Sequence, residues 1–316
     1  RDLVRSRGLG DVYKRQAREI AERELLLIVT PEPEEVKKQI AAIVNMENVR
    51  FLECGTNDTW ARDHGAITMM DADGPSLLDF TFNGWGLKFA SHLDNQITRH
   101  AVENGILKGR YVNRLGFVLE GGSIESDGMG TLLTTSECLL SPNRNGQKNK
   151  VEIEEYLKSV FQVRQILWLD DGYLAGDDTD SHIDTLARFC PADTIVYVQC
   201  EDETDEHYEA LQAMEEQLHS FRTLNGEPYR LLALPMADKI VEEGERLPAT
   251  YANFLILNGT ILYPTYNQPE NDRRACEVLQ EAFPGYQMVG IDCRPLIKQH
   301  GSLHCVTMQY PLGVLK

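Results

Sequence analysis

The 316-residue chain has no apolar run near the roughly 20 residues that a membrane-spanning helix needs. The longest candidate, residues 25–29, is only strand length. No apolar segment follows the basic residues at the start, so no secretory signal is recognisable. We therefore expect a soluble, cytoplasmic protein.

Positive charge is also scarce, with 31 Lys and Arg against 49 Asp and Glu and a net charge of −18. Binding of nucleic acid or anionic membranes needs a basic surface, so we expect neither partner. The field of an acidic protein can attract a small cationic substrate. Many proteins are acidic merely for solubility, and taken by itself the charge favours that reading. The sequence leaves a homo-oligomer open.

The seven cysteines are odd in number and form no C-x-x-C pair. This argues against a disulfide framework and against a zinc–thiolate site. Most should be small buried residues, and one could be a nucleophile. The sequence positions are Cys54, Cys138, Cys190, Cys200, Cys276, Cys293 and Cys305.

No Pro- or Ser-rich linker divides the chain, which favours one catalytic domain over residues 17–316. Residues 1–16 carry five basic and two acidic side chains, unlike the acidic remainder. We expect them to be a non-native leader outside the fold.

A unit of strand, helix and strand recurs five times, at starts roughly 50 to 65 residues apart. The first strands are expected at 25–30, 77–82, 131–140, 194–200 and 260–266. Helices with 3.6-residue apolar periodicity are expected at 34–45, 91–104, 150–161, 205–221 and 270–283. The second strands are expected at 49–54, 110–118, 165–169, 229–234 and 287–292.

Five such copies around one axis would make an α/β propeller. The competing arrangement is an open, doubly wound sheet. That alternative lacks support, because no first strand is followed by a G-x-G-x-x-G or Walker loop.

Polar loops follow the second strands, at 57–65, 119–123, 177–184, 250–254 and 300–305. In a closed ring, equivalent loops would meet at one end of the axis. They would bring together an aromatic ring, several carboxylates, a histidine and a cysteine.

These groups suit a guanidinium, which is planar, always charged and matched by carboxylates. A thiolate could attack carbon while a histidine transfers protons. On a strand, the i, i+2 spacing of His182 and Asp184 would place both side chains on one face.

Structural explanations compete with each assignment. Cys305 could be a buried strand cysteine, and we assign Cys138 to the core. His300 and His304 would share a face on a helix and could bind metal there. Gly301 and the β-type run after it argue against a helix, so we expect both histidines to be structural or to organise loops.

The acidic stretch 177–184 could instead bind a hard cation and serve a metal-dependent hydrolase. Gly121, after Glu120, could simply supply a positive φ in a tight turn. A non-catalytic propeller that acts as a binding module is a further alternative.

Four motifs together resemble the agmatine deiminase family, which includes bacterial peptidylarginine deiminases. The resemblance spans about residues 17–312 and implies the pentein fold, a five-bladed α/β propeller, without metal or cofactor. The motifs are Trp60-x-Arg62-Asp63, Glu120-Gly121-Gly122-Ser123, Thr179-Asp180-x-His182-x-Asp184 and His304-Cys305.

The resemblance implies hydrolysis of agmatine to N-carbamoylputrescine and ammonia through a covalent Cys305 thiouronium. Peptidylarginine or free arginine is the alternative substrate for the same residues. His182 would transfer protons, Asp63 and Asp184 would bind the guanidinium, and Glu120 would orient His182 or a second nitrogen. The substrate would also contact Trp60, Asp178 and Asn253.

The sequence departs from the family pattern in two places. The family commonly has Glu at the position of Asp178 and Gly at that of Ser181. It also carries a strand and a tryptophan-bearing loop before the first helix, where this chain has residues 1–16. We therefore expect an incomplete first blade.

Overall fold

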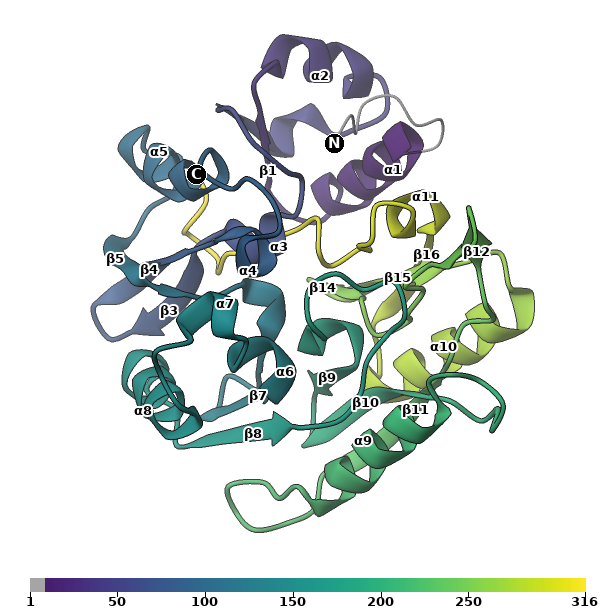
Figure 1. Ribbon diagram of the computed structural model, residues 1–316. Coiled ribbons are helices and arrows are strands. Elements are labelled where there is room, and N and C mark those ends of the chain that lie inside the picture. The colour runs from purple at the N-terminus through teal and green to yellow at the C-terminus, as the bar shows by residue number, and fades with distance from the viewer. Residues whose placement is uncertain (1–8) are drawn as a thin grey trace. The chain divides into compact units, whose positions relative to one another are not determined.

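A computed structural model describes residues 9–316 of the chain, which has a mixed α/β fold (Figure 1). The chain divides into two compact units. Unit 1 comprises residues 1–121 and 305–316, and unit 2 comprises residues 122–304. No helix among residues 9–316 is both long and apolar enough to cross a membrane.

Unit 1 contains two separate sheets. The first pairs β1 (Leu26–Thr30) with β2 (Val49–Glu53) in parallel, with α2 (Pro33–Ile40) and a 3₁₀ turn (Met46–Asn48) between them. The second has the order β3 (Ile67–Asp71), β4 (Gly74–Thr81), β5 (Arg110–Val118). Its helical segments are α3 (Ala61–His64), α4 (Gly84–Leu87), a 3₁₀ turn (Asp94–Gln96) and α5 (Ile97–Glu103).

Unit 2 contains three sheets of three strands and a short hairpin. The strands are β6 (Ile124–Ser126), β7 (Thr131–Thr135), β8 (Gln165–Leu169), β9 (Ala187–Cys190), β10 (Thr194–Gln199), β11 (Arg230–Pro235), β14 (Leu255–Leu257), β15 (Thr260–Thr265) and β16 (Gln287–Asp292), and the hairpin is β12 (Val241–Glu242) and β13 (Glu245–Arg246). The helical segments are η3 (Gly121–Ser123), α6 (Ser136–Leu139), α7 (Pro142–Asn145), α8 (Lys150–Phe161), η4 (Ile183–Thr185), α9 (Tyr208–Ser220), α10 (Pro269–Ala282) and α11 (Arg294–Ile297), of which η3 begins at the last residue of unit 1. Helix α9 packs on β10, and α10 packs on β11 and β16 (Figure 1).

The structure contains the five strand–helix–strand units that the sequence predicted. In each, two parallel strands flank a helical segment: β1–β2, β4–β5, β7–β8, β10–β11 and β15–β16. Strands β5, β8 and β16 and helix α8 have the predicted bounds.

A further antiparallel strand precedes four of these pairs, and the sequence analysis missed all four. They are β3, β6, β9 and β14, of three to five residues each. Such short strands offer too little alternation to be recognised. Within residues 9–316 the β1–β2 sheet has two strands, and the five sheets are separate from one another.

The predicted strand 131–140 was too long, because α6 begins at Ser136. The Thr135 side chain caps this turn by accepting a hydrogen bond from the Cys138 N–H. The predicted helix 91–104 was also too long, since a 3₁₀ turn precedes α5.

Helix α1 (Leu9–Ala21) includes the second half of the predicted leader, and residues 1–8 lie outside the described part. Val12 and Gln16 are buried. The Tyr13 hydroxyl lies 3.3 Å from Thr59 Oγ1, in the first polar loop. Residues 10–16 therefore take part in the packing of unit 1.

The last twelve residues, 305–316, pack within unit 1. Val314 is fully buried and shares a cluster with Leu77 of β4 and Leu107. The N–H of Lys108 donates to the Val314 carbonyl at 2.7 Å. This return of the C-terminus places Cys305 in the same unit as the first polar loop.

Candidate active site

The predicted site residues divide between the two units, because the boundary passes between residues 121 and 122 and between residues 304 and 305. Unit 1 contains Trp60, Asp63, Glu120 and Cys305, whereas unit 2 contains Asp178, His182, Asp184 and Asn253. In unit 1 the structure places Trp60 and Cys305 in one cluster, and Asp63 is bonded to Trp85 of that cluster. In unit 2 the Asn253 side chain is bonded to the Asp184 carbonyl.

Cys305 lies in a turn over residues 303–306, so it is not the strand cysteine of the structural alternative. Its side chain is 7% exposed and packs in a cluster with Trp60, Phe82 and Trp85. Phe82 and Trp85 contact edge to face, with ring centroids 4.9 Å apart. Cys305 therefore belongs to an aromatic cluster, and the faces of aromatic rings attract planar cations.

Asp63 lies in the short helix α3 and is buried. Its Oδ2 accepts a hydrogen bond from the indole Nε1 of Trp85 at 3.0 Å. The sequence analysis predicted Asp63 and Trp60 but missed Trp85. The unit 1 set thus combines a thiol, aromatic rings and an oriented carboxylate.

The backbone around Trp85 has a left-handed conformation, which sets the position of the side chain. Gly84, Trp85 and Gly86 have φ angles of 68°, 57° and 82°, in the left-handed region that favours glycine. The Asn83 side chain accepts a hydrogen bond from the Gly86 N–H at 2.9 Å. A tryptophan between two glycines after a buried strand is the sequence signal that could have identified it.

Arg62 ties helix α3 to the chain around the predicted nucleophile. Its N–H donates to the Cys305 carbonyl at 3.0 Å. Its guanidinium donates to Gln309 Oε1 at 2.9 Å and contacts Met308 Sδ at 3.5 Å. Arg62 therefore holds Cys305 through the backbone.

Glu120 follows β5 and is fully buried. Gly121 does not have a positive φ, so the positive-φ explanation for this glycine is wrong. A Cβ at Gly121 would lie 2.1 Å from the carbonyl oxygen of Arg62. Glycine is required here by a close approach of two backbone segments.

Two carboxylates of the acidic loop 177–184 in unit 2 organise that loop. Asp177 accepts from the Thr179 hydroxyl at 2.7 Å and from the Ser181 N–H at 2.9 Å. Burial raises the pKa of Asp177, while these hydrogen bonds act to lower it. Asp180 pairs with the buried Arg144 at 2.6 Å. These contacts supply a structural role for the acidic stretch.

His182 and Asp184 are both buried, but they do not lie on a strand as predicted. Ile183–Thr185 forms a 3₁₀ turn with His182 at its start. The backbone before it is left-handed, with φ of 66° at Asp180 and 59° at Ser181, which interrupts any extended run. The i, i+2 spacing of His182 and Asp184 therefore does not place both side chains on one strand face.

His300 and His304 organise loops, as predicted. His300 Nδ1 lies 2.8 Å from the Gly176 carbonyl. His304 Nδ1 lies 2.7 Å from Asp184 Oδ2, with both side chains buried. The contact between His304 and Asp184 therefore joins the residue next to Cys305 in sequence to an aspartate that is predicted to bind the guanidinium.

Asn253 is fully buried and connects two of the site loops in unit 2. Its side chain accepts from the His304 N–H at 2.8 Å and donates to the Asp184 carbonyl at 3.3 Å. Asp178 is half-buried in the loop before His182. All seven cysteines are free thiols, and Cys138 is fully buried.

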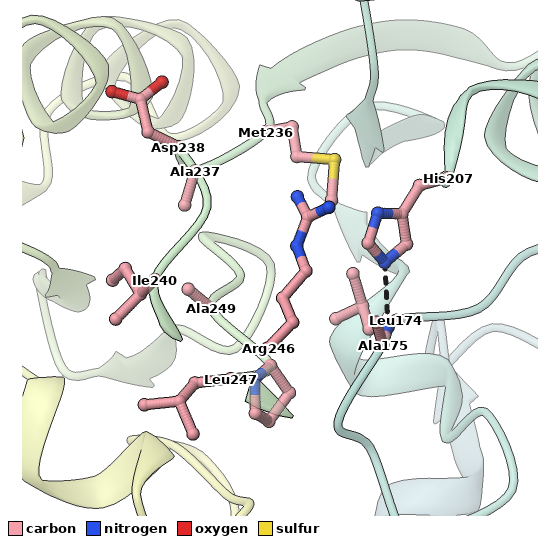
Figure 2. Close-up of a pocket in the computed structure, with 11 residues that line it drawn as sticks. Leu174, Ala175, His207, Met236, Ala237, Asp238, Ile240, Arg246, Leu247 and Ala249 are labelled. Atoms are coloured by element: carbon pink, nitrogen blue, oxygen red, sulfur yellow. Dashed lines mark hydrogen bonds between the residues drawn. The ribbon is translucent and has the colours of Figure 1, made fainter. Parts of the chain in front are cut away.

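A small cavity in unit 2 is lined by Leu174, Ala175, His207 and Arg246, among others (Figure 2). His207 accepts from the Ala175 N–H at 2.8 Å, so its other nitrogen donates to Asp205 at 2.7 Å. Arg246 also pairs with Asp205, at 2.8 Å. The free volume of about 10 Å³ is near the limit for one water molecule, so a guanidine does not fit.

Comparison with known proteins relates the whole chain to deiminases. The family model of the Porphyromonas-type peptidyl-arginine deiminases matches residues 6–311. A substrate-bound agmatine deiminase from C. jejuni is 41% identical, with 94% of this chain and 85% of that chain covered and a TM-score of 0.86. The agmatine deiminase of Enterococcus faecalis is 29% identical, with 95% and 87% covered and a TM-score of 0.87.

A structure from Porphyromonas gingivalis, provisionally named an arginine deiminase, is 49% identical with a TM-score of 0.94. The match covers 98% of this chain and 92% of the P. gingivalis chain. A Marinomonas protein provisionally named an agmatine deiminase is 34% identical. The match covers 84% of this chain and 77% of the Marinomonas protein. The chain therefore belongs to the Porphyromonas-type peptidyl-arginine deiminase family, and it is a hydrolase.

Proposed function

We propose that the protein hydrolyses the guanidinium group of agmatine to N-carbamoylputrescine and ammonia. The observation that carries this proposal is the set formed by Cys305, Trp85 and Asp63 in unit 1. Cys305 and Trp85 belong to one buried cluster, and the Trp85 indole donates to the Asp63 carboxylate at 3.0 Å. A guanidinium is a planar cation that suits both an aromatic face and a carboxylate.

In the proposed first step, the Cys305 sulfur attacks the guanidinium carbon and forms a C–S bond. His182 gives a proton to one terminal nitrogen, the C–N bond breaks, and ammonia leaves. The product of this step is a thiouronium attached to Cys305. Asp63 and Asp184 bind the remaining nitrogens and keep the carbon in place.

In the second step, His182 takes a proton from water, and the oxygen attacks the thiouronium carbon. The C–S bond then breaks, the remaining hydroxyl proton passes to solvent, and Cys305 leaves as the thiolate while the ureido product is released. Each cycle consumes one water and releases one ammonia and one proton. In this scheme Glu120 orients His182 or a further nitrogen, Trp60 flanks the substrate, and Asp178 and Asn253 complete the binding site.

Free arginine or peptidylarginine is the second candidate substrate, favoured by the family and by the similarity to the Porphyromonas gingivalis structure. The three substrates share the guanidinium and differ at the remote end, where agmatine carries an amine and no carboxylate. Kinetics on agmatine, arginine and an arginine peptide, assayed side by side for ammonia and the ureido product, would rank them.

Cys305→Ala tests the mechanism. We expect turnover to fall below detection, because no other group supplies the nucleophile. Cys276→Ala, on helix α10, is the matched control and should retain activity. Mass spectrometry after treatment with a haloacetamidine should find the label on Cys305.

Turnover by Cys305→Ala close to that of the unaltered protein would refute the covalent mechanism. Labelling at a different cysteine, with Cys305 unmodified, would contradict the assignment of the nucleophile. Activity that a chelator abolishes and a divalent ion restores would favour a metal-dependent hydrolase instead.

We also propose that the five strand–helix–strand units form the blades of an α/β propeller. The five parallel strand pairs, each with its helical segment, support this arrangement. An experimental structure in which the five sheets do not surround one axis would contradict it.

A further inference from the structure

A chain of charged and polar groups, from half-buried Glu125 through buried Arg188 and His304, ends at the carboxylate of Asp184. Glu125 Oε2 pairs with Arg188 Nε at 3.0 Å. Arg188 Nη2 lies 3.4 Å from His304 Nε2, and His304 Nδ1 lies 2.7 Å from Asp184 Oδ2. All four residues belong to unit 2.

Arg188 is itself firmly held. Its Nη1 donates to the carbonyls of Phe254 at 2.8 Å and Ala252 at 3.1 Å. Its guanidinium also stacks over the Phe254 ring at 4.5 Å. The Nη2 group is therefore directed at His304 by a framework of fixed contacts.

This geometry sets the tautomer of His304. An arginine guanidinium stays charged and can only donate hydrogen bonds. His304 Nε2 must then accept from Arg188, so the single imidazole proton lies on Nδ1 and is donated to Asp184. A neutral imidazole in this position orients Asp184 without cancelling its charge.

We propose that His304 is a positioning residue that presents Asp184 to the guanidinium as an oriented carboxylate. The inference rests on the proposed function, in which Asp184 binds the substrate. Because a carboxylate is planar, fixing Oδ2 also fixes the direction of Oδ1. The role is distinct from that of His182, which transfers protons.

Two substitutions separate this role from general packing. His304→Asn keeps an N–H close to the position of Nδ1, whereas His304→Leu removes the donor at similar size. We expect His304→Leu to raise KM for agmatine about tenfold, with a smaller change in kcat, because a hydrogen bond to a charged group is lost. His304→Asn should recover most of the change in KM.

The reactivity of Cys305 with iodoacetamide provides a control, because this reagent is neutral and needs no carboxylate. Its alkylation rate should be the same in both variants and in the unaltered protein. An Asn variant as impaired as the Leu variant, or an alkylation rate that falls together with the rise in KM, would overturn the proposal.

Nitrogen-15 NMR of histidine-labelled protein tests the tautomer without any substrate. The His304 signals, assigned from their loss in His304→Leu, should show a protonated Nδ1 and an unprotonated Nε2. A doubly protonated ring or the opposite tautomer at neutral pH would contradict the proposal. If the NMR result holds while no guanidine is hydrolysed, the proposed function fails and the arrangement of His304 stands.

Discussion

The indole N–H of Trp85 donates to the carboxylate of Asp63 across 3.0 Å, and both side chains are buried. The bond joins two segments of unit 1, helix α3 and the glycine-flanked turn of α4. A tryptophan that also packs with Cys305 therefore fixes the direction of a predicted guanidinium ligand.

Trp85→Phe keeps an aromatic ring and removes only the hydrogen-bond donor. A bond to a charged group contributes about 1.5–3 kcal/mol, so we expect KM for agmatine to rise at least about tenfold. Steady-state kinetics checks this. Trp168→Phe removes a similar indole–carboxylate bond, to Glu154 at 3.1 Å, and should leave KM unchanged. Equal effects of the two substitutions would show that the Asp63 contact has no special role.

Arg144 should hold the loop that carries His182. Its guanidinium bonds Asp180 at 2.6 Å and the Thr179 carbonyl at 2.8 Å. In Arg144→Met these groups lose their partner, and we expect turnover to fall about tenfold and the free energy of unfolding to fall by about 1–3 kcal/mol. Turnover assays and urea unfolding measure the two effects.

Arg273→Met is the matched control, because Arg273 makes two ion pairs on the exposed face of α10. Exposed pairs contribute about 0–1 kcal/mol, so this variant should unfold nearly as the unaltered protein does. An Arg144→Met variant that keeps full activity would contradict the assigned role.

Gly121→Ala should destabilise unit 1, because its Cβ would lie 2.1 Å from the Arg62 carbonyl oxygen. Overpacking of this kind costs about 1–3 kcal/mol, which we expect as a lower midpoint in urea unfolding. Gly116→Ala, with no atom within 4 Å of the added Cβ, is the control. Similar midpoints for the two variants would argue against the close approach.

Because His64 is buried, we expect the stability of the folded protein to depend on pH. Burial lowers the pKa of His64 to about 4 from an ordinary 6.5, and neither ring nitrogen has a hydrogen-bond partner within residues 9–316. The unfolded chain thus binds a proton more tightly than the folded protein does. The stability that the neutral ring provides is present above pH 6.5 and is lost as the pH falls towards 4.

The loss amounts to about 3 kcal/mol across this window. Urea unfolding at pH 7.5 and 4.5 measures it, and His64→Phe should reduce the difference between the two pH values. His219 is an exposed residue of α9, and His219→Gln should leave the difference in unfolding free energy between the two pH values unchanged. A His64→Phe variant with the full pH dependence would assign the effect to other groups.

Much of the fold could be read from local patterns. The helix at 150–161 and the strands at 110–118, 165–169 and 287–292 match the sequence prediction, because apolar periodicity and capping act over neighbouring residues. Strands such as β14, of three residues, were missed because they are stabilised by pairing with β15 and carry little signal of their own. The 3₁₀ turn after His182 was missed because left-handed Asp180 and Ser181 have no reliable local signature.

The sequence by itself determined which chemical groups are present and in what order, including Cys305, His182 and the two aspartates. The bond of Trp85 to Asp63 and that of His304 to Asp184 were decided only by the tertiary structure. Asp63 and Trp85 are 22 residues apart, and Asp184 and His304 are 120 apart. Local periodicity carries no information over such separations, because hydrogen bonds of this kind depend on how loops pack after the sheets have formed.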